Sequence, residues 1–222
     1  MIIVHHLETS RSHRILWLLE EMGLDYEVKV YKRDPVTMLA PPELKAVHPL
    51  GKSPVISDGV RTLAESGAIL EYLTDAHPES GLAPTRGSDA WVRFIYWLHF
   101  AEGTAMPPLL MKLVFDRIET APLPFFARPI ARAIARKAKA GFIAPRLAEN
   151  LDFMEAELGR SEWFAGDAFS AADIQMSYPI EASQKRAGLD ATRPKLTAFL
   201  QKIRARPAYQ RAVVRGGGGP MP

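Results

Sequence analysis

The sequence predicts an α/β domain built on a mixed four-stranded sheet, followed by an all-helical domain. The first observation is the alternation of short β-branched runs with helical patterns over residues 1–79. The second is that no further pair of strand-like runs follows, while apolar residues go on recurring at helical spacing. The third is the composition, since 222 residues with 47% hydrophobic and 24% charged side chains suit a globular protein with one or two cores.

A strand, a helix and a second strand open the chain. The β-branched run MIIVHH, residues 1–6, predicts a buried strand. SRSHRILWLLEEMGL, residues 10–24, has apolar side chains at helical spacing, and Gly23 suits a helix C-cap. DYEVKVY, residues 25–31, alternates apolar and charged residues and predicts a strand with one polar face. The intervening helix lets the two strands run parallel.

A short helix, a hairpin and a longer helix complete this domain. Pro41–Pro42 suits the start of a short helix. In PVISDGVRTL, residues 54–63, the pair Asp58–Gly59 predicts a two-residue type I′ turn between antiparallel strands. SGAILEYLTDAH, residues 66–77, predicts a helix that Pro78 ends. The element order is therefore β-α-β-α-β-β-α, which predicts a mixed sheet covered by helices.

The rest of the chain is predicted to be helical. Ser88 suits the N-cap of a helix that Pro107–Pro108 interrupts or kinks. A long basic-faced helix is expected near residues 125–158, with Pro145 inside it. Ser170 and Asp173 have the spacing of a capping box, and two short helices follow near 194–204 and 207–214. The predicted boundaries are a first domain at 1–79, a linker at 80–87, a helical domain at 88–214 and a flexible tail at 215–222.

The composition excludes several kinds of chemistry. The chain has no cysteine, so disulfides, thiolate metal sites and a protein thiol nucleophile are impossible. His5 and His6 alternate on opposite faces of a strand, which makes them poor joint ligands, and we expect no metal. No run of eighteen apolar residues is present, and the apolar stretch at the N-terminus is too short for a signal peptide. These features predict a cytoplasmic protein.

Charge is divided unevenly along the chain. Residues 1–80 carry 8 Lys and Arg against 12 Asp and Glu, a net −4, and residues 81–222 carry 20 against 13, a net +7. A basic surface of this kind can bind nucleic acid or an anionic membrane. The spacing of Arg and Lys among Ala and Ile in ARPIARAIARKAKA is more typical of the solvated face of an amphipathic helix. We therefore expect neither a nucleic acid nor a membrane partner.

The run HPLGKSP, residues 48–54, points to a peptide-binding turn. Proline at the start of a strand suits a cis peptide bond, and such a turn can present the backbone of Ser53 to an extended peptide. Lys52 can meet a carboxylate. The pair Glu65–Ser66 enters a helix, where a carboxylate side chain can bind an ammonium and the helix N-terminus can bind a second carboxylate. The ligand that fits is a small zwitterionic peptide with a carboxylate at each end, and glutathione is such a molecule.

The pattern HPLGKSPVISDG followed by LAESGAILEYL resembles the glutathione-binding half of cytosolic glutathione S-transferases. FSAADI is similar to the capping box of their helical domain, so the resemblance covers about residues 1–213. The runs SRSHRILWLLEEMGLDYE and WLHFAEGTAMPPLL are most similar to the bacterial and fungal subgroup near the yeast transferase 1 type. The resemblance implies a thioredoxin-like N-terminal domain, a homodimer, and glutathione as co-substrate without a metal.

The resemblance also implies a role for each residue of the motif. The backbone of Ser53 would bind the cysteinyl part of glutathione. Glu65 and Ser66 would bind the γ-glutamyl end, and Lys52 would bind the glycyl carboxylate. The helical domain would contribute the electrophile pocket. The aromatic-rich set on its first helix either lines this pocket or belongs to the helical core: Tyr96, Trp97, His99, Phe100 and Met106.

The catalytic group is expected between the first strand and the first helix. At the place of the family's catalytic tyrosine this chain has Leu7, and Tyr26 is the nearest tyrosine. Cysteine-type members are excluded by composition. The hydroxyl class remains, and its serine often stands four residues before an arginine of the first helix, which counted from Arg14 is Ser10.

Thr9 and Ser12 are the other candidates, and Ser12 stands where many serine-type members have proline. A hydroxyl that donates to sulfur at a helix N-terminus favours the thiolate, which is the nucleophile. The expected activity is conjugation of glutathione to small apolar electrophiles in detoxification, or reduction of peroxides. The alternative is a non-catalytic binding or interaction module of the same fold, whereas a thiol-disulfide oxidoreductase is excluded because the chain has no cysteine.

Overall fold

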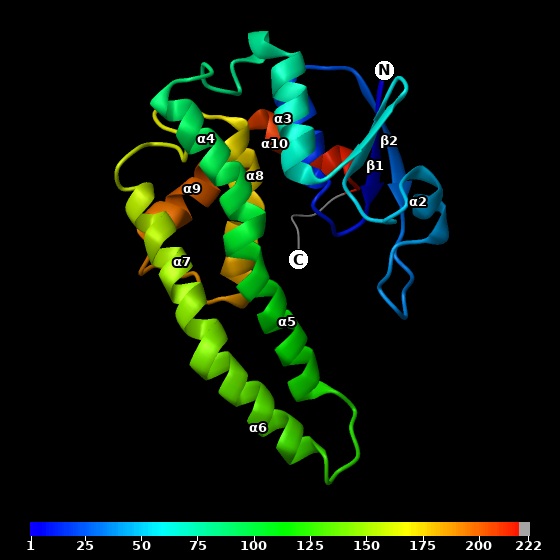
Figure 1. The fold of residues 1–222 in the computed structure, drawn as a ribbon, viewed down its shortest axis with the longest axis vertical. Coiled ribbons are helices and arrows are strands. Elements are labelled where there is room, and N and C mark those ends of the chain that lie inside the picture. Colours follow the sequence, from blue (N-terminus) through cyan, green and yellow to red (C-terminus); the bar gives the residue numbers. More distant parts are fainter. Residues whose placement is uncertain (218–222) are drawn as a thin grey trace.

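The computed structural model describes residues 1–217. Its N-terminal part contains a four-stranded sheet in the order β2-β1-β3-β4, in which β1 runs parallel to β2 and antiparallel to β3 (Figure 1). The element order and the mixed sheet predicted from the sequence are confirmed. The elements are β1 Ile2–Leu7, α1 His13–Met22, β2 Tyr26–Tyr31, α2 Pro42–Val47, β3 Val55–Asp58, β4 Arg61–Ala64 and α3 Ser66–Ala76.

The two faces of the sheet are covered differently. Val4 of β1 pairs with Val28 of β2 and Ile56 of β3, and its side chain lies in the main core beneath α1 and α3. On the other face a smaller cluster joins Leu7, Tyr31 and Leu44 of α2. Burial of branched side chains on the first face stabilises the fold by about 1.5–3 kcal/mol for each fully buried residue.

The hairpin turn lies one residue beyond its predicted position. Asp58 pairs with Arg61, so the two central residues are Gly59 and Val60 rather than Asp58–Gly59. Gly59 has φ +57°, which suits the first central position of a type II′ turn, where glycine avoids a steric penalty. Val60 is fully exposed. The sequence pair was identified correctly as a hairpin signal, but the strand register extends through Asp58.

The second part is helical, as predicted, and α8 lies at its centre with its residues from Ala171 to Ser183 buried. None of the helices within residues 1–217 is long and apolar enough to cross a membrane. The elements are the 3-10 turn η1 Pro78–Ser80, α4 Asp89–Phe100, the π-helical segment η2 Ala101–Ala105, α5 Met106–Thr120, α6 Arg128–Ala138, the π-helical segment η3 Lys139–Ile143, α7 Ala144–Glu157, α8 Ala171–Arg186, α9 Pro194–Ala205 and α10 Pro207–Arg215.

Two π-helical segments stand where the sequence predicts proline kinks. Segment η2 precedes Pro107, and η3 precedes Pro145. Both prolines occupy the first turn of an α-helix that continues directly from a π-helical segment, so a residue without an N–H interrupts the regular i→i−4 bonds at each junction. The long basic helix expected over residues 125–158 therefore begins at Arg128 and runs through η3 to Glu157.

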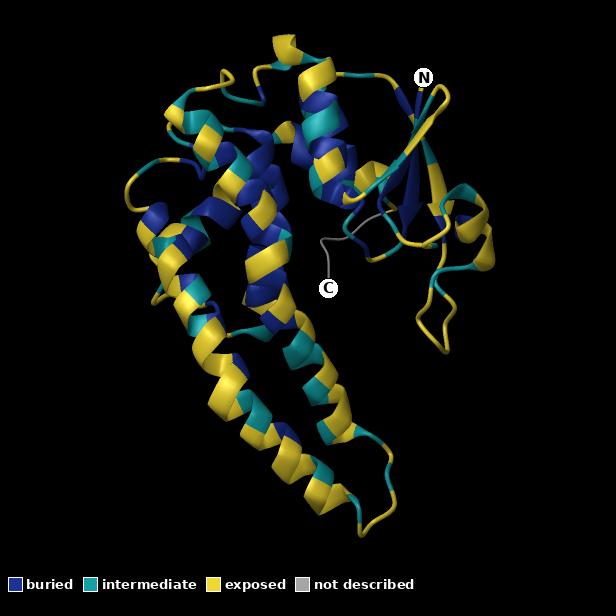
Figure 2. Cartoon of the chain, viewed as in Figure 1, coloured by how far each residue is buried: buried dark blue, intermediate teal, exposed yellow. Residues whose placement is uncertain are grey.

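Helices α5 and α6 form an arm that extends away from the rest of the molecule (Figure 1). Most of the arm is exposed, whereas buried residues concentrate around α8 and the sheet (Figure 2). At the chain end, α10 closes at Arg215 and the carbonyl of Gly216 accepts a hydrogen bond from His6. Residues 218–222 of the predicted flexible tail lie outside the described residues.

The predicted capping box at α8 is present and completely buried. The Asp173 carboxylate accepts bonds from the backbone N–H groups of Ser170 and Phe164, both at 2.9 Å, and from the Ser170 hydroxyl at 3.1 Å. The same side chain therefore caps α8 and anchors the loop before it. Burial raises the pKa of Asp173 to about 7, while the three donors act in the opposite direction.

Asp173→Ala should lower the free energy of unfolding by about 2–4 kcal/mol, because it leaves buried N–H groups without an acceptor. Urea denaturation followed by circular dichroism measures this loss. Asp89→Ala is the matched control, since Asp89 is an exposed first-turn acid of α4 and its removal should cost less than about 0.5 kcal/mol. Equal losses in the two variants would contradict the structural role assigned to Asp173.

Candidate active site

Ser10 lies in the turn between β1 and α1 and has only 7% of its surface exposed. Its Oγ is 2.7 Å from Ser12 Oγ and 3.3 Å from Ser53 Oγ. Thr9 beside it is exposed and has φ +56°, an uncommon conformation for a residue with a side-chain branch. Of the three candidate hydroxyls, Ser10 is the one that contacts Ser53, and Ser12, at the N-cap position of α1, contacts Ser10.

Ser53 precedes Pro54, and the peptide bond between them is cis. The Ser53 hydroxyl donates to the carbonyl of His5 at 3.0 Å and accepts from the N–H of Leu7 at 3.3 Å. Within residues 1–217, the backbone N–H and carbonyl of Ser53 have no hydrogen-bond partner. The turn is therefore fixed against β1 by its side chain, while its backbone groups remain open to an extended ligand.

Glu65 and Ser66 stand at the N-terminus of α3. Glu65 is exposed and has φ +73°, a conformation that costs a residue with a Cβ roughly 1–3 kcal/mol and is enriched at ligand sites. Ser66 is 3% exposed, and its hydroxyl accepts from Arg14 at 2.8 Å. Lys52, in the loop before Pro54, is exposed. The structure thus places a carboxylate, a buried hydroxyl and a helix N-terminus together.

Arg14 of α1 is the residue whose role the sequence did not reveal, since there it served only to locate Ser10. Its side chain is 1% exposed, and it donates to the Gln175 carbonyl at 2.9 Å, to Ser66 Oγ at 2.8 Å and to Glu102 Oε1 at 2.6 Å. Glu102 projects from the π-helical segment η2 and also contacts Arg11 Nε at 3.1 Å. The signal available in the sequence was the position of Arg14, one helical turn before Leu18 and therefore on the apolar side of the predicted helix.

Burial and charge oppose each other in this cluster. Burial lowers the pKa of Arg14, and the Glu102 carboxylate counters it by favouring the charged guanidinium. Burial alone would raise the pKa of Glu102, yet Arg14 and Arg11 hold that pKa below its usual range. Arg14 and Arg11 together exceed the charge of Glu102, while the Glu65 carboxylate stands next to Ser66. The site therefore offers positive charge to a ligand carboxylate and negative charge to a ligand ammonium.

The aromatic-rich set of α4, together with Met106 of α5, divides between the core and the surface. Trp97, Phe100 and Met106 are buried and belong to the hydrophobic clusters of the helical part. Tyr96 and His99 are exposed, and the Tyr96 ring packs against Phe100. The first three residues therefore belong to the hydrophobic core. Within residues 1–217 no cluster of three His, Asp or Glu residues is suited to a metal ion.

Comparison with known proteins identifies the family. Residues 1–75 match the glutathione S-transferase N-terminal domain, and residues 118–207 match the C-terminal domain. Glutathione S-transferase 3 of Schizosaccharomyces pombe is 39% identical over 83% of this chain and 75% of its own length. Glutathione S-transferase 1 of Saccharomyces cerevisiae is 32% identical over 94% of this chain and 92% of its own length.

A solved structure gives the same result. The crystal structure of a glutathione S-transferase from Actinobacillus pleuropneumoniae superimposes with a TM-score of 0.82 at 34% identity, covering 99% of this chain and 94% of the other. The chain therefore belongs to the glutathione S-transferase family. The family predicted from the sequence is confirmed, and so is its similarity to the yeast transferase 1 type.

Glu102→Gln should lower the free energy of unfolding by about 1–3 kcal/mol, because Arg14 stays buried without its carboxylate partner. The expected loss is moderate because the Glu102 side chain is 33% exposed and water can partly compensate. Chemical denaturation measures the loss. The control is Asp75→Asn, which breaks an ion pair with Arg86 in which both side chains are more than 60% exposed, and which should change stability by less than about 0.5 kcal/mol. Similar losses in both variants would refute a structural role for the buried pair.

Proposed function

We propose that this chain is a glutathione transferase that activates the glutathione thiol through the Ser10 hydroxyl and joins the sulfur to small apolar electrophiles in detoxification. The observation that carries the proposal is the 3.3 Å approach of Ser10 Oγ to Ser53 Oγ, which puts the candidate catalytic hydroxyl beside the turn expected to hold the cysteinyl residue. Reduction of hydroperoxides by the same thiolate is part of the proposal.

Glutathione would bind along residues that the fold already groups together. Its cysteinyl backbone would pair with the free N–H and carbonyl of Ser53, as an added strand does. Its α-ammonium would meet the Glu65 carboxylate, and its γ-glutamyl carboxylate would meet Ser66 and the N-terminus of α3, beside the buried charge of Arg14. The glycyl carboxylate would meet Lys52.

The chemistry requires the thiolate. A free thiol has a pKa of about 8.5, so only a few per cent is ionised at neutral pH. A hydroxyl donor and the positive end of α1 both favour the charged form. A downward shift of about 2 pKa units corresponds to about 2.7 kcal/mol of preferential thiolate binding. The thiolate then attacks the electrophilic atom, forms the new bond to sulfur and expels the leaving group where one is present.

Ser10→Ala should raise the pKa of bound glutathione and lower kcat at least about tenfold, with a smaller change in glutathione affinity. The reason is that the hydroxyl contacts only the sulfur, while Ser53, Glu65 and Ser66 hold the rest of the tripeptide. Thiolate absorbance of the binary complex against pH gives the measurement, and Thr9→Ala is the matched control. An upward shift in Thr9→Ala with none in Ser10→Ala would transfer the role to Thr9.

A binding module of the same fold is the alternative, and two assays separate it from an enzyme. The enzyme should be retained on immobilised glutathione and should also conjugate glutathione to chlorodinitrobenzene. A protein that is retained on immobilised glutathione but turns over neither chlorodinitrobenzene nor epoxides, isothiocyanates or hydroperoxides would instead be the non-catalytic module. We also propose a cytoplasmic location, because the reaction needs the reduced glutathione that the cytosol maintains.

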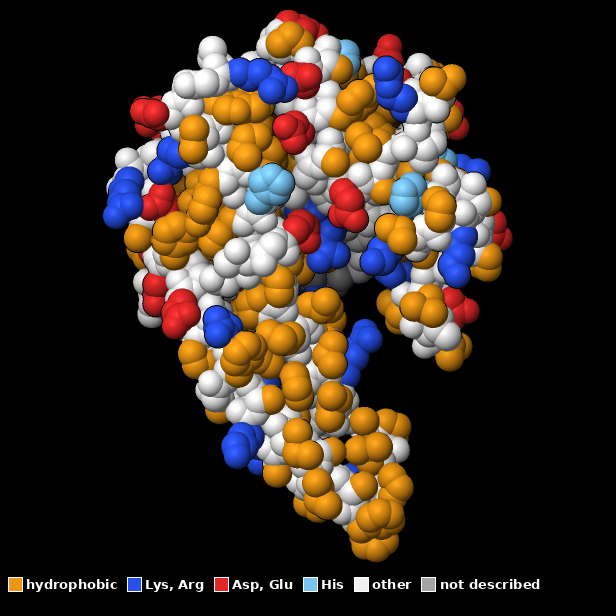
Figure 3. Space-filling view, in the orientation of Figure 1, with side chains coloured by type: hydrophobic (Ala, Val, Ile, Leu, Met, Phe, Trp, Pro, Cys, Tyr) orange, Lys and Arg blue, Asp and Glu red, His pale blue; other side chains and the backbone are white. Residues whose placement is uncertain are grey.

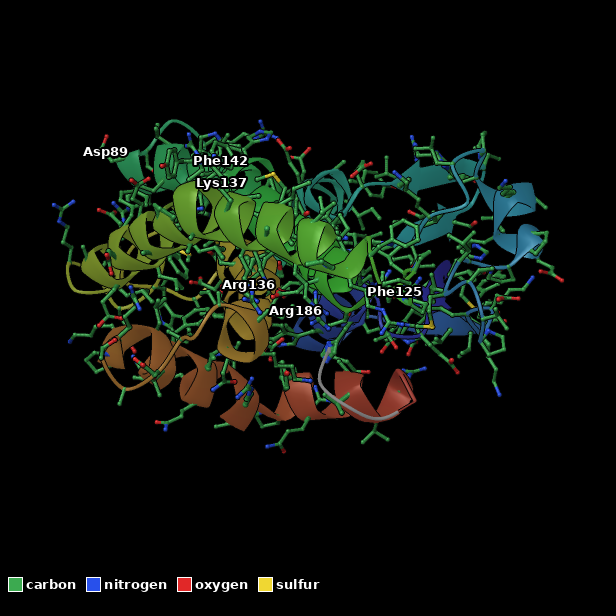
Figure 4. All side chains as sticks on the ribbon, turned by 90° about the horizontal axis from the view of Figure 1, so that it is seen from below. Asp89, Phe125, Arg136, Lys137, Phe142 and Arg186 are labelled. Atoms are coloured by element: carbon green, nitrogen blue, oxygen red, sulfur yellow. The ribbon has the colours of Figure 1, made fainter. Side chains whose placement is uncertain are left out.

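We further propose that two copies form a symmetric homodimer through the apolar face of α4 and of the arm. Hydrophobic side chains gather along the arm in Figure 3, and those on α5 and α6 that are exposed follow helical spacing: Leu110, Val114, Ile118, Ile130 and Ile134. Seen from below, Phe142 and Lys137 lie on one side of the α6–α7 rod and Arg136 lies on the other (Figure 4). Arg136 pairs with Glu119 of α5, whereas Lys137 shares its side of the rod with the apolar Phe142.

The charge division supports the same arrangement. Residues 1–80 carry a net −4 and residues 81–222 a net +7, so the first domain of one copy attracts the helical domain of the other. The proposed units are a glutathione-binding domain at 1–79, a linker at 80–87 and a helical domain at 88–214, followed by a flexible tail at 215–222. An isologous contact is the commonest closed assembly.

Val114→Glu should convert the dimer to a monomer, because a two-fold contact buries two carboxylates in an apolar interface. Sedimentation equilibrium should give twice the 24.7 kDa chain mass for the unmodified protein and the single mass for the variant. Val36→Glu is the control, since Val36 is 89% exposed in the loop before α2, away from the arm. An unmodified chain that stays monomeric at all concentrations would overturn the proposal.

A further inference from the structure

A chain of hydrogen bonds extends from Ser10 into the protein interior. Ser10 Oγ lies 2.7 Å from Ser12 Oγ, Ser12 Oγ lies 2.9 Å from His6 Nδ1, and His6 Nε2 lies 3.0 Å from the carbonyl oxygen of Gly216. All three side chains are buried, with 7%, 0% and 4% of their surfaces exposed for Ser10, Ser12 and His6. This series of hydrogen bonds connects the candidate catalytic hydroxyl of Ser10 to Gly216, the residue that follows α10.

The carbonyl of Gly216 determines which atom is the donor in each hydrogen bond between His6, Ser12 and Ser10. A carbonyl oxygen only accepts, so His6 Nε2 carries a hydrogen and donates it. In a neutral imidazole Nδ1 is then an acceptor, so the Ser12 hydroxyl donates to His6. Ser12 has one hydrogen, so in the 2.7 Å contact the Ser10 hydroxyl donates to Ser12. Ser10 also has only one hydrogen, and the 2.7 Å contact takes it in preference to the longer 3.3 Å contact with Ser53 Oγ. The hydrogen of Ser10 therefore points inward, and a lone pair of its oxygen is available to a ligand.

Ser12 occupies the N-cap position of α1 but does not act as a cap. A serine at this position ordinarily accepts a hydrogen bond from an N–H of the first helical turn. Here the side chain makes no capping bond, and its hydroxyl bonds His6 and Ser10 instead. A helix-capping role therefore does not explain the hydroxyl, whereas a link between Ser10 and His6 does.

We propose that Ser12 and His6 are positioning residues that carry the thiol proton of glutathione inward and turn the Ser10 hydroxyl toward the sulfur. The proposal rests on the proposed function of Ser10. The thiol gives its hydrogen to Ser10 Oγ, Ser10 gives its own to Ser12 Oγ, and Ser12 gives its own to His6 Nδ1. The S–H bond breaks and an Nδ1–H bond forms, each hydroxyl loses one hydrogen and gains one, and the products are a thiolate and an imidazolium.

The surroundings of His6 suit this cycle. Burial lowers its pKa, which keeps the imidazole neutral and able to accept, while the Gly216 carbonyl and Glu8 act in the opposite direction and favour the cation. His13 of α1 is the other titratable group beside it, and burial lowers the pKa of His13 to about 4, so it stays uncharged at neutral pH. The thiolate that forms supplies the compensating negative charge.

Gly216 allows the close approach that the last bond requires. A Cβ at this position would stand 3.3 Å from His6 Cε1 and 3.2 Å from a methyl carbon of Leu16. These contacts are tighter than ordinary van der Waals separations, so a side chain here would press the imidazole away from Ser12. The turn after α10, which the His6–Gly216 bond joins to β1, is thereby part of the proposed proton path, and α10 ends close to β1 in Figure 1.

The test compares thiolate formed with protons released when glutathione binds near neutral pH. Thiolate is read from its absorbance, and proton release from binding enthalpies in buffers of different ionisation enthalpy. S-methylglutathione, which has no thiol proton, gives the proton release due to the rest of the tripeptide and is subtracted. The unmodified protein should form thiolate while releasing clearly less than about one proton for each thiolate, because His6 retains the proton.

Two variants interrupt the path at different points. His6→Asn keeps an acceptor for Ser12 but cannot take up a proton, and Ser12→Ala removes the intermediate hydroxyl. Each should raise the pKa of bound glutathione by about one unit and release about one proton for each thiolate that still forms. His5→Asn is the matched control, because His5 is a buried imidazole of the same strand that bonds Tyr31 and Ser57, and it should keep the unmodified ratio.

The outcomes separate the two proposals. A ratio of one proton per thiolate in the unmodified protein, or an unchanged ratio in both His6→Asn and Ser12→Ala, overturns the proton path and leaves the role of Ser10 intact. Absence of any thiolate in the unmodified complex overturns the role of Ser10 and the path with it. Ser12→Ala removes a single oxygen, so it keeps the test decisive if His6→Asn does not fold.

Discussion

The buried guanidinium of Arg14 is the interaction on which the rest of the site depends. It joins four segments that are far apart in the sequence, since it lies on α1 and bonds Ser66 of α3, Glu102 of η2 and the backbone of α8. A planar group with five donors satisfies these acceptors in one orientation only, and an unpaired charge at this depth would be strongly destabilising. The N-terminal sheet and the helical bundle are therefore fixed against each other beside the site, where displacement would separate Ser10 from Ser66.

Backbone conformation at the site shows a second constraint. Thr9 and Glu65 both have positive φ, although neither is glycine. Glycine would adopt these angles at no steric cost, so Thr9 and Glu65 each lower the stability of the fold at a segment that flanks the proposed ligand. At Glu65 the side chain provides the carboxylate that a ligand ammonium needs, which explains why glycine does not occupy the position. The buried bonds of Arg14 and Ser66 supply the stability that tolerates such angles.

Much of this arrangement was predictable from the sequence, and the exceptions have a common cause. The strands and the helix caps at Gly23, Ser88 and Ser170 follow from local pattern, because spacing and turn residues act over a few positions. The glutathione S-transferase family follows from the resemblance of the motifs around Pro54, Glu65 and Ser170 to those of known members. The turn at Gly59–Val60 was displaced by one residue because pairing with β1 extends β3 through Asp58. The roles of Arg14 and Glu102 were missed because they depend on a contact across 88 positions. No spacing rule reports such a contact.

The same reasoning explains why the sequence predicts no role for the histidines of the first strand other than metal binding, which their alternation disfavours. Alternation along β1 separates His5 from His6, and each then finds partners on its own face of the sheet: Tyr31 and Ser57 for His5, Ser12 and Gly216 for His6. The two imidazoles are neighbours in the sequence but have different hydrogen-bond partners. His6 differs from His5 because the turn after α10 brings the Gly216 carbonyl next to its ring. A carbonyl 210 positions away sets the tautomer of His6, and that tautomer sets the direction of the Ser10 hydroxyl. The orientation of the candidate catalytic group is thus determined at the opposite end of the chain.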